Sequence, residues 1–192
     1  APVFSFAKLH SVDTGLGPEM KSTGEVMGRD LTFNKALYKA LLSSGMQIPH
    51  HGVVLATIAD KDKNEAIPLL KNFAALGFKI IATEGTAKLF KEHHLDTESV
   101  KKINEGTPNV LSLVDEKRVN IVINTISSGK KANTDGFLLR RKSVEKGIIC
   151  LTSLDTVKAF LLALESITFS TYSLPQYHNA KPQEKSETQW IH

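Results

Sequence analysis

The chain has 192 residues and a formal net charge of +4, a length that suits one ordinary domain with a further segment attached. Hydrophobic residues make up 41% and charged residues 23%, a balance that excludes a fibrous or wholly disordered chain. No run approaches the roughly 20 apolar residues of a membrane span, and the first residues lack the order of a signal peptide. We therefore expect a cytoplasmic protein without a membrane partner.

The first 50 residues contain little apolar material. Residues 4–6 predict a strand, residues 15–28 carry four glycines and a proline, and residues 31–42 predict a helix with one apolar face. Pro49 then marks a boundary. We interpret this segment as a fragment of a preceding domain.

From Gly52 onward, short apolar runs alternate with longer amphipathic runs, which is typical of a parallel sheet covered by helices in a three-layer α/β/α sandwich. The predicted strands are residues 53–58, 79–82, 120–124 and 148–151, with a weaker candidate at 99–103. The predicted helices are residues 64–76, 86–93, 110–116, 137–146 and 155–164.

Three local features of this region bear on the predicted helices and strands. Pro68 suggests that the helix assigned to residues 64–76 begins later than Asn64. The cationic run at residues 140–142 is interpreted as a solvated helix face. Cys150 lies in an apolar run, so we expect a buried, inert thiol.

Beyond residue 167 no period is sustained, which predicts a tail.

Polar side chains follow the predicted strands, where ligands bind in α/β proteins. Thr83, Gly85 and Thr86 lie between a strand and a helix. Two interpretations stay open: a phosphate site at the helix N-terminus, where the glycine allows a tight turn, or Thr86 as a simple N-cap.

Further candidates follow the other strands. Asn124 and Ser127 open a loop rich in hydroxyls and glycine, and Thr152 ends the last strand. Lys63 and Lys102 offer charge for a phosphate. A surface loop and ordinary solvated lysines are the alternatives. The sequence contains no Walker-type loop, HExxH motif, cysteine pair or GxSxG elbow, and the adjacent histidines at residues 50–51 and 93–94 diverge. A binding module without a metal site is favoured.

Residues 15–28, GLGPEMKSTGEVMG, closely resemble the stretch that ends the second ATP-grasp half of carbamoyl-phosphate synthase large chains. ATEGTA at residues 82–87, INT at 123–125 and LRR at 139–141 follow in the order and spacing of that family's regulatory domain. The resemblance covers about residues 1–167. It implies an ATP-grasp remnant at residues 1–48, a methylglyoxal-synthase-like domain with a five-stranded parallel sheet at 49–167, and a tail at 168–192.

The resemblance also implies an allosteric effector such as UMP, IMP or phosphoribosyl pyrophosphate, bound without catalysis by this segment. Carried over position by position, the effector site comprises Lys63, Thr83, Thr86, Lys102 and Asn124, with a serine hydroxyl from Ser127 or Ser128 and with Thr152 nearby. The implied partners are the rest of the large chain and a glutaminase small chain, and no nucleic acid. The segment itself needs no cofactor, whereas the intact enzyme uses ATP and Mg²⁺ or Mn²⁺ to make carbamoyl phosphate from bicarbonate and glutamine-derived ammonia.

This chain departs from the family pattern at two positions. Ile126 stands where a threonine is expected, and Cys150 replaces the tyrosine of members controlled by ornithine, so a nucleotide or phosphoribosyl effector is favoured. Two alternatives are a stand-alone methylglyoxal-synthase-like phosphate lyase and a ligand-free interaction module. The lyase is weakened because residues 104–109 lack the expected catalytic aspartate.

Overall fold

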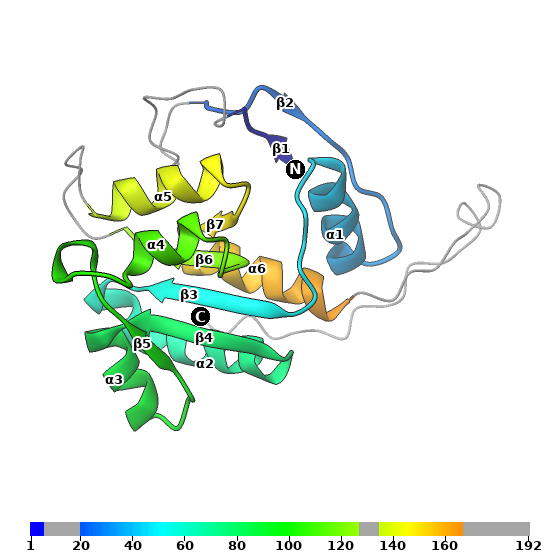
Figure 1. The fold of residues 1–192 in the computed structure, drawn as a ribbon. Helices are drawn as coiled ribbons and strands as arrows, with labels where there is room; N and C mark the ends of the chain where they lie inside the picture. Colours follow the sequence, from blue (N-terminus) through cyan, green and yellow to red (C-terminus); the bar gives the residue numbers. More distant parts are fainter. Residues whose placement is uncertain (6–19, 127–134, 167–192) are drawn as a thin grey trace.

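The computed structural model describes residues 1–5, 20–126 and 135–166 (Figure 1). The strands are β1 (Pro2–Val3), β2 (Gly24–Glu25), β3 (Gly52–Thr57), β4 (Phe78–Thr83), β5 (Glu98–Val100), β6 (Ile121–Asn124) and β7 (Ile149–Leu151). The helices are α1 (Phe33–Ser43), α2 (Lys63–Ala75), α3 (Glu84–Glu92), α4 (Val110–Asp115), α5 (Asp135–Glu145) and α6 (Leu154–Glu165), with 3₁₀ turns η2 (Asp60–Asp62) and η3 (Ile103–Glu105).

Five parallel strands form the central sheet, in the order β5-β4-β3-β6-β7. Its central strand β3 is apolar from Val53 to Ala56, and Val54, Leu55 and Ala56 are fully buried. Such runs pack on both faces at once, as parallel sheets require. The predicted α/β fold with a five-stranded parallel sheet is confirmed.

Helices cover both faces of the sheet. Successive residues of β6 alternate between two core clusters, with Ile121 and Ile123 in one and Val122 in the other. The first cluster includes side chains from α1, α2, α3 and α6, and the second includes side chains from α4 and α5. Figure 1 shows α4 and α5 on the opposite side of the sheet from α2 and α6. The arrangement is a three-layer sandwich.

Several details differ from the sequence predictions. The first strand is Pro2–Val3 and excludes Phe4, because its pairing with β2 ends there; Phe6 lies outside the described residues. Helix α2 begins at Lys63 and continues through Pro68. Pro68 is exposed, so water can donate a hydrogen bond to the Asn64 carbonyl in place of the N–H that proline lacks.

Two expectations about single side chains are also corrected. Arg140 and Arg141 are 5% and 7% exposed, and therefore do not form a solvated face. They are buried because their stretch of α5 packs against the end of β6, and their guanidinium groups hydrogen-bond within the protein. Cys150 is only half-buried, against the second core cluster.

The amino-terminal segment packs on the α/β core. Tyr38 of α1 and the following Ile48 belong to the first core cluster, next to α6. Asp30 forms a 2.7 Å ion pair with Lys39 and accepts a hydrogen bond from the N–H of Leu31. The predicted division at residue 48 stays a prediction, but α1 shares one core with the sheet.

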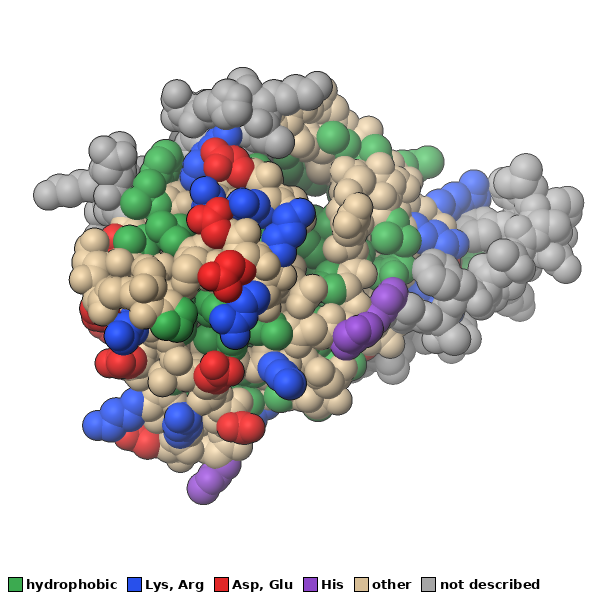
Figure 2. Space-filling model, in the orientation of Figure 1, with side chains coloured by type: hydrophobic (Ala, Val, Ile, Leu, Met, Phe, Trp, Pro, Cys, Tyr) green, Lys and Arg blue, Asp and Glu red, His purple; other side chains and the backbone are tan. Residues whose placement is uncertain are grey.

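Charges of both signs are mixed on the surface seen in Figure 2, where Lys and Arg side chains lie among Asp and Glu over the middle of the molecule. This face therefore carries no broad field of one sign of the kind that nucleic acid attracts. Among the described helices, none is long and apolar enough to cross a membrane.

Candidate functional site

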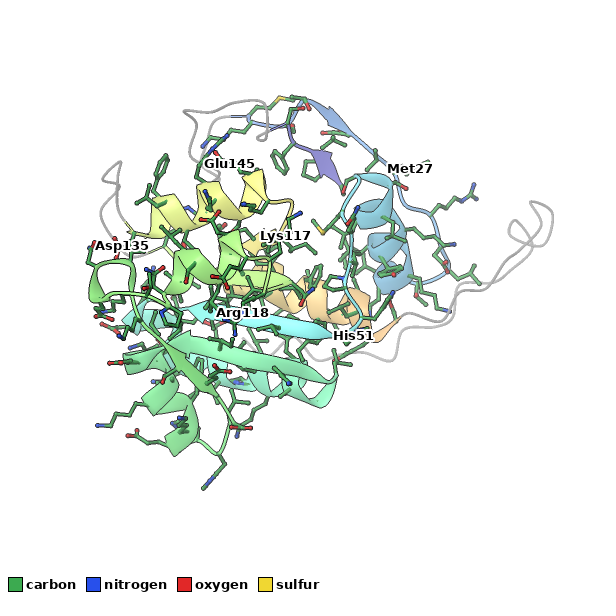
Figure 3. All side chains as sticks on the ribbon, in the orientation of Figure 1. Met27, His51, Lys117, Arg118, Asp135 and Glu145 are labelled. Carbon is green, nitrogen blue, oxygen red and sulfur yellow. The ribbon has the colours of Figure 1, made fainter. Side chains whose placement is uncertain are left out.

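The candidate site lies at the carboxyl edge of the sheet, where all five strands end side by side. The strands end at Thr57, Thr83, Val100, Asn124 and Leu151. Parallel strands bring these ends together, so successive residues 17 to 27 positions apart in the chain share one edge. In Figure 3, Asp135 marks this edge, and His51 lies at the opposite edge before β3. The His50–His51 pair is thus remote from the site.

The N-terminus of α3 is the part of this edge best suited to an anion. Thr83 occupies the N-cap position, but its side chain caps no helix amide. Its hydroxyl donates instead to the Thr86 hydroxyl at 3.4 Å, and Thr86 is 2% exposed. The interpretation of Thr86 as N-cap is therefore wrong, because the helix begins at Glu84, directly after the strand. The first-turn N–H groups lack a side-chain cap.

Gly85 plays a different role from the predicted tight turn. It lies inside the first turn of α3 and does not adopt a left-handed conformation. A Cβ at this position would meet nothing within 4 Å. The glycine therefore leaves open space above the helix N-terminus, where a phosphate can approach the backbone closely.

The two predicted lysines lie in segments that follow different strands. Lys63 forms a 2.6 Å ion pair with Asp60 of η2. The hydrogen bond and charge of Lys63 lower the pKa of Asp60, and the positive charge of Lys102 lowers it further. Lys102 precedes η3 after β5, so its charge comes to this edge from a second strand end. Such a pair suits a phosphate, which carries more charge than a carboxylate.

Asn124 lies at the end of β6 in a network that the sequence did not predict. Its Nδ2 donates to the Thr57 hydroxyl at 2.7 Å, and its Oδ1 accepts a 2.8 Å hydrogen bond from Arg140. Asn124 is 6% exposed. Arg140 is a functional candidate that the sequence analysis does not identify. The signal that could point to it is Gly136, a poor helix former that lies one turn earlier in the chain.

The remaining predicted residues are less central. Thr152 is half-buried after β7, and β7 is four strands from β5. At about 4.8 Å per strand, Thr152 and Lys102 lie on the order of 19 Å apart, too far for one phosphate to bridge. Ser153 is the N-cap of α6 and accepts a hydrogen bond from the N–H of Thr156. Ser127 and Ser128 lie outside the described residues.

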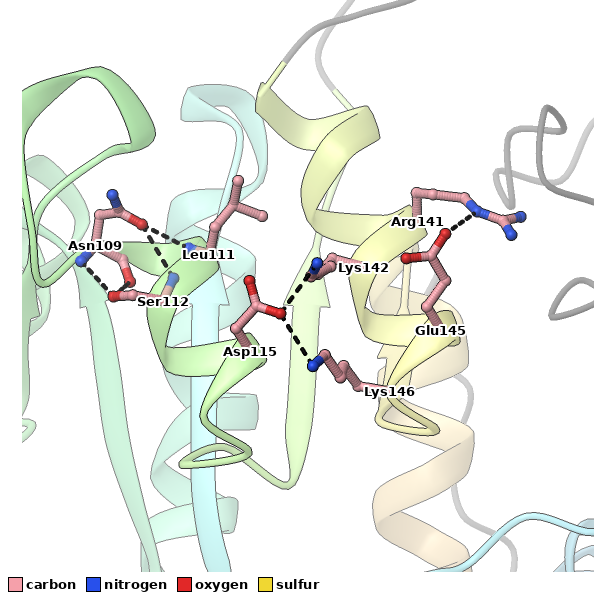
Figure 4. A network of polar contacts seen from close by, with 8 residues as sticks. All are labelled: Asn109, Leu111, Ser112, Asp115, Arg141, Lys142, Glu145 and Lys146. Atoms are coloured by element: carbon pink, nitrogen blue, oxygen red, sulfur yellow. Dashed lines mark hydrogen bonds and ion pairs between the residues drawn. The ribbon is translucent and has the colours of Figure 1, made fainter.

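Asn109, in the loop after β5, hydrogen-bonds to the first turn of α4 (Figure 4). The Asn109 oxygen accepts from the N–H groups of Leu111 and Ser112, and its Nδ2 donates to the Gly106 carbonyl. Asn109 is therefore occupied in capping α4.

Figure 4 also shows Asp115 of α4 between Lys142 and Lys146 of α5, at 3.0 and 3.1 Å. These ion pairs join the two helices on one face.

Metal binding finds no support in the described part of the chain, where no group of three or more His, Cys, Asp or Glu side chains is placed to hold an ion. The carboxyl edge carries N–H, hydroxyl and ammonium donors, which recognise anionic oxygen atoms, and also the Asp60 carboxylate.

Comparison with known proteins supports the fold assignment. Residues 65–152 match the family model described as the MGS-like domain, so an MGS-like domain is present. The match includes Thr83, Thr86, Lys102 and Asn124, and Lys63 lies just before it. Among solved structures, the crystal structure of methylglyoxal synthase from Elizabethkingia anophelis NUHP1 is similar at 18% identity with a TM-score of 0.48, over 60% of this chain and 80% of that chain.

Proposed function

We propose that this chain binds a phosphorylated small molecule at the carboxyl edge of its sheet and serves as the effector-binding domain of a carbamoyl-phosphate synthase large chain. The effector is of the UMP, IMP or phosphoribosyl pyrophosphate type. The proposal joins the resemblance of residues 15–28 and of the strand ends to the geometry of the site. The rest of the large chain and a glutaminase small chain are the proposed partners.

The observation that carries the proposal is the position of Lys63 and Lys102 on either side of the uncapped N-terminus of α3. These lysines come from segments after β3 and β5, which flank β4 in the sheet. The uncapped N-terminus of α3 follows β4 and therefore lies between them. A helix N-terminus with two nearby ammonium groups offers an anion directed N–H donors and charge-assisted hydrogen bonds.

The geometry suggests how a nucleotide would lie along this edge. Its phosphate would bind over α3, where the Thr83 hydroxyl adds a donor. Its sugar or base would extend past Thr57 and Asn124 toward Thr152, across strands β3, β6 and β7. A ligand of nucleotide length suits the separation between the two groups of residues better than phosphate alone.

Binding at this edge would act on the whole enzyme through the packing of the domain. A ligand shifts an equilibrium only by its differential affinity for two states, and allosteric coupling is typically about 1–3 kcal/mol. The synthase reaction itself would take place elsewhere in the enzyme. ATP and Mg²⁺ or Mn²⁺ would bind there too.

Calorimetric titration with UMP, IMP and phosphoribosyl pyrophosphate tests the proposal. We expect saturable binding of at least one of them, weakened about tenfold by Lys63→Ala or Lys102→Ala, since each removes a charge-assisted hydrogen bond. Lys79→Ala is the matched control, because this exposed lysine lies at the other end of β4. No heat at millimolar concentrations of all three ligands would contradict the proposal and favour a ligand-free interaction module.

A second candidate function is favoured by the MGS-like domain match alone. In that case the chain would be a phosphate lyase similar to methylglyoxal synthase and would act on dihydroxyacetone phosphate. The loop at residues 104–109 argues against it, because it contains no aspartate and Asn109 is occupied in helix capping. An assay of phosphate release from dihydroxyacetone phosphate separates the two candidates.

A further inference from the structure

Arg140 joins helix α5 to the ends of two neighbouring strands. Its Nη1 donates to Asn124 Oδ1 at 2.8 Å, and Asn124 Nδ2 in turn donates to the Thr57 hydroxyl at 2.7 Å. Thr57 and Asn124 are direct partners in the register of β3 and β6. With Arg140 5% exposed and Asn124 6% exposed, the chain of hydrogen bonds is held by buried groups.

Gly136 provides a second, independent sign that this contact is built into the fold. A Cβ at Gly136 would lie 3.2 Å from Arg140 Nη1 and 3.4 Å from Asn124 Oδ1. Gly136 has no left-handed backbone conformation that would require glycine. Its lack of a side chain therefore leaves space for the guanidinium to reach the amide.

The chemistry of the two partners fixes the orientation of the Asn124 amide. A half turn of a carboxamide exchanges its oxygen and nitrogen. A hydroxyl such as that of Thr57 can pair with either end, because it donates to the oxygen or accepts from the N–H. A guanidinium group only donates, so Arg140 selects the oxygen end. The nitrogen end is thereby directed toward β3, whose following segment carries Lys63.

We propose that Arg140 is a positioning residue of the effector site, which holds Asn124 as an N–H donor toward the sugar or base of the ligand. The proposal rests on the function proposed above. It deepens that function by assigning ligand class: the edge at Asn124 then recognises an oxygen acceptor, such as a sugar oxygen or a base carbonyl oxygen, and discriminates against a group that needs an acceptor.

A double-mutant cycle with UMP as the probe tests this role. Arg140→Met should weaken UMP binding about tenfold in the wild-type background, since the amide no longer has a fixed orientation. In an Asn124→Ala background the same change should have less than a twofold effect, because Arg140 acts through Asn124. Arg141→Met is the matched control, since Arg141 is also buried but its Nε hydrogen-bonds to Glu145 within α5.

A spectroscopic readout on the unmodified chain keeps the test decisive if Arg140→Met does not fold. In NMR spectra, the Asn124 side-chain amide protons should shift on addition of UMP. Additive losses in the cycle, or no shift at saturation, would overturn the role of Arg140 alone. If wild type binds neither phosphate nor UMP, the proposed function fails as well.

Discussion

Asp60 places a negative charge where the proposed ligand would bring another. Its carboxylate pairs with Lys63 at 2.6 Å, and its side chain is 93% exposed. The hydrogen bond and charge of Lys63, with the charge of Lys102, hold its pKa below the ordinary value of 3.8. Asp60 is therefore ionised at neutral pH, and it would compete with the proposed phosphate for Lys63.

Removing this charge should strengthen phosphate binding. We expect Asp60→Asn to lower the Kd for inorganic phosphate about fivefold, because one nearby repulsive charge in a solvated site is worth about 1 kcal/mol. Calorimetry at low ionic strength measures the change, and the gain should shrink as salt is added. Asp96→Asn is the control, since Asp96 is exposed at the amino edge before β5. An unchanged or raised Kd for Asp60→Asn would show that the two lysines do not meet the anion.

At the scale of residues, sequence reasoning identified donors but not their partners. Lys63 and Lys102 were marked by their place after strands, which is a property of the chain alone. Arg140 was missed because a run of three cations is usually solvated. Only the packing of α5 against β6 makes its second residue a buried donor to Asn124. Burial of a charge depends on contacts between distant segments.

Among the elements, α1 is tied to the segment that precedes it by a close backbone approach at Gly28. A Cβ at this position would lie 1.9 Å from the Ala36 carbonyl oxygen and 2.5 Å from the Ala40 nitrogen. The Asp30–Lys39 ion pair holds the same segment against the same helix. No flexible side chain can yield at Gly28, because the nearest atoms belong to the helix backbone.

Gly28→Ala should therefore destabilise the protein by about 1–3 kcal/mol, the usual cost of forcing extra volume into a packed contact. Urea unfolding followed by circular dichroism measures the difference. Gly24→Ala is the matched control, since its Cβ would meet nothing within 4 Å, and we expect less than about 0.5 kcal/mol. Equal stability of the two variants would contradict the close packing of this segment on α1.

Across the whole molecule, α1 and the α/β sandwich share one core cluster. Tyr38 and Ile48 are buried against the same group of side chains as Phe160 and Leu164 of α6. Residues that share a core tend to unfold together. The amino-terminal segment thus contributes to the stability of the sheet, whatever its origin.

Hydrogen exchange in the intact chain tests this cooperation. In moderate denaturant, we expect peptides from α1, α6 and β3 to exchange at similar rates, as parts of one cooperative unit. Mass spectrometry of peptic fragments gives these rates. Peptides from β1 and β2 serve as the internal reference, because that two-residue pairing buries little and should exchange first. Much faster exchange of α1 than of α6 would instead support two separate units.

The fold was more predictable than the contacts of its first segment. Continuous apolar runs identify buried parallel strands, so β3, β4, β6 and β7 were expected within about two residues. The docking of α1 was not expected, because residues 31–42 show an apolar face without showing what covers it. The predicted start of helix α2 is too late. Exposure of Pro68 decides whether the helix continues through the proline, and the sequence does not reveal that exposure.

The register of β3 and β6 has a mechanical consequence. Thr57 and Asn124 are fixed opposite each other by the sheet ladder, and a slip of one residue would turn every buried side chain of β6 toward the wrong face. The ladder therefore favours a fixed spacing of the strand ends. We expect any displacement on ligand binding to fall on the elements that follow them, above all α3 after β4 and α5 after β6.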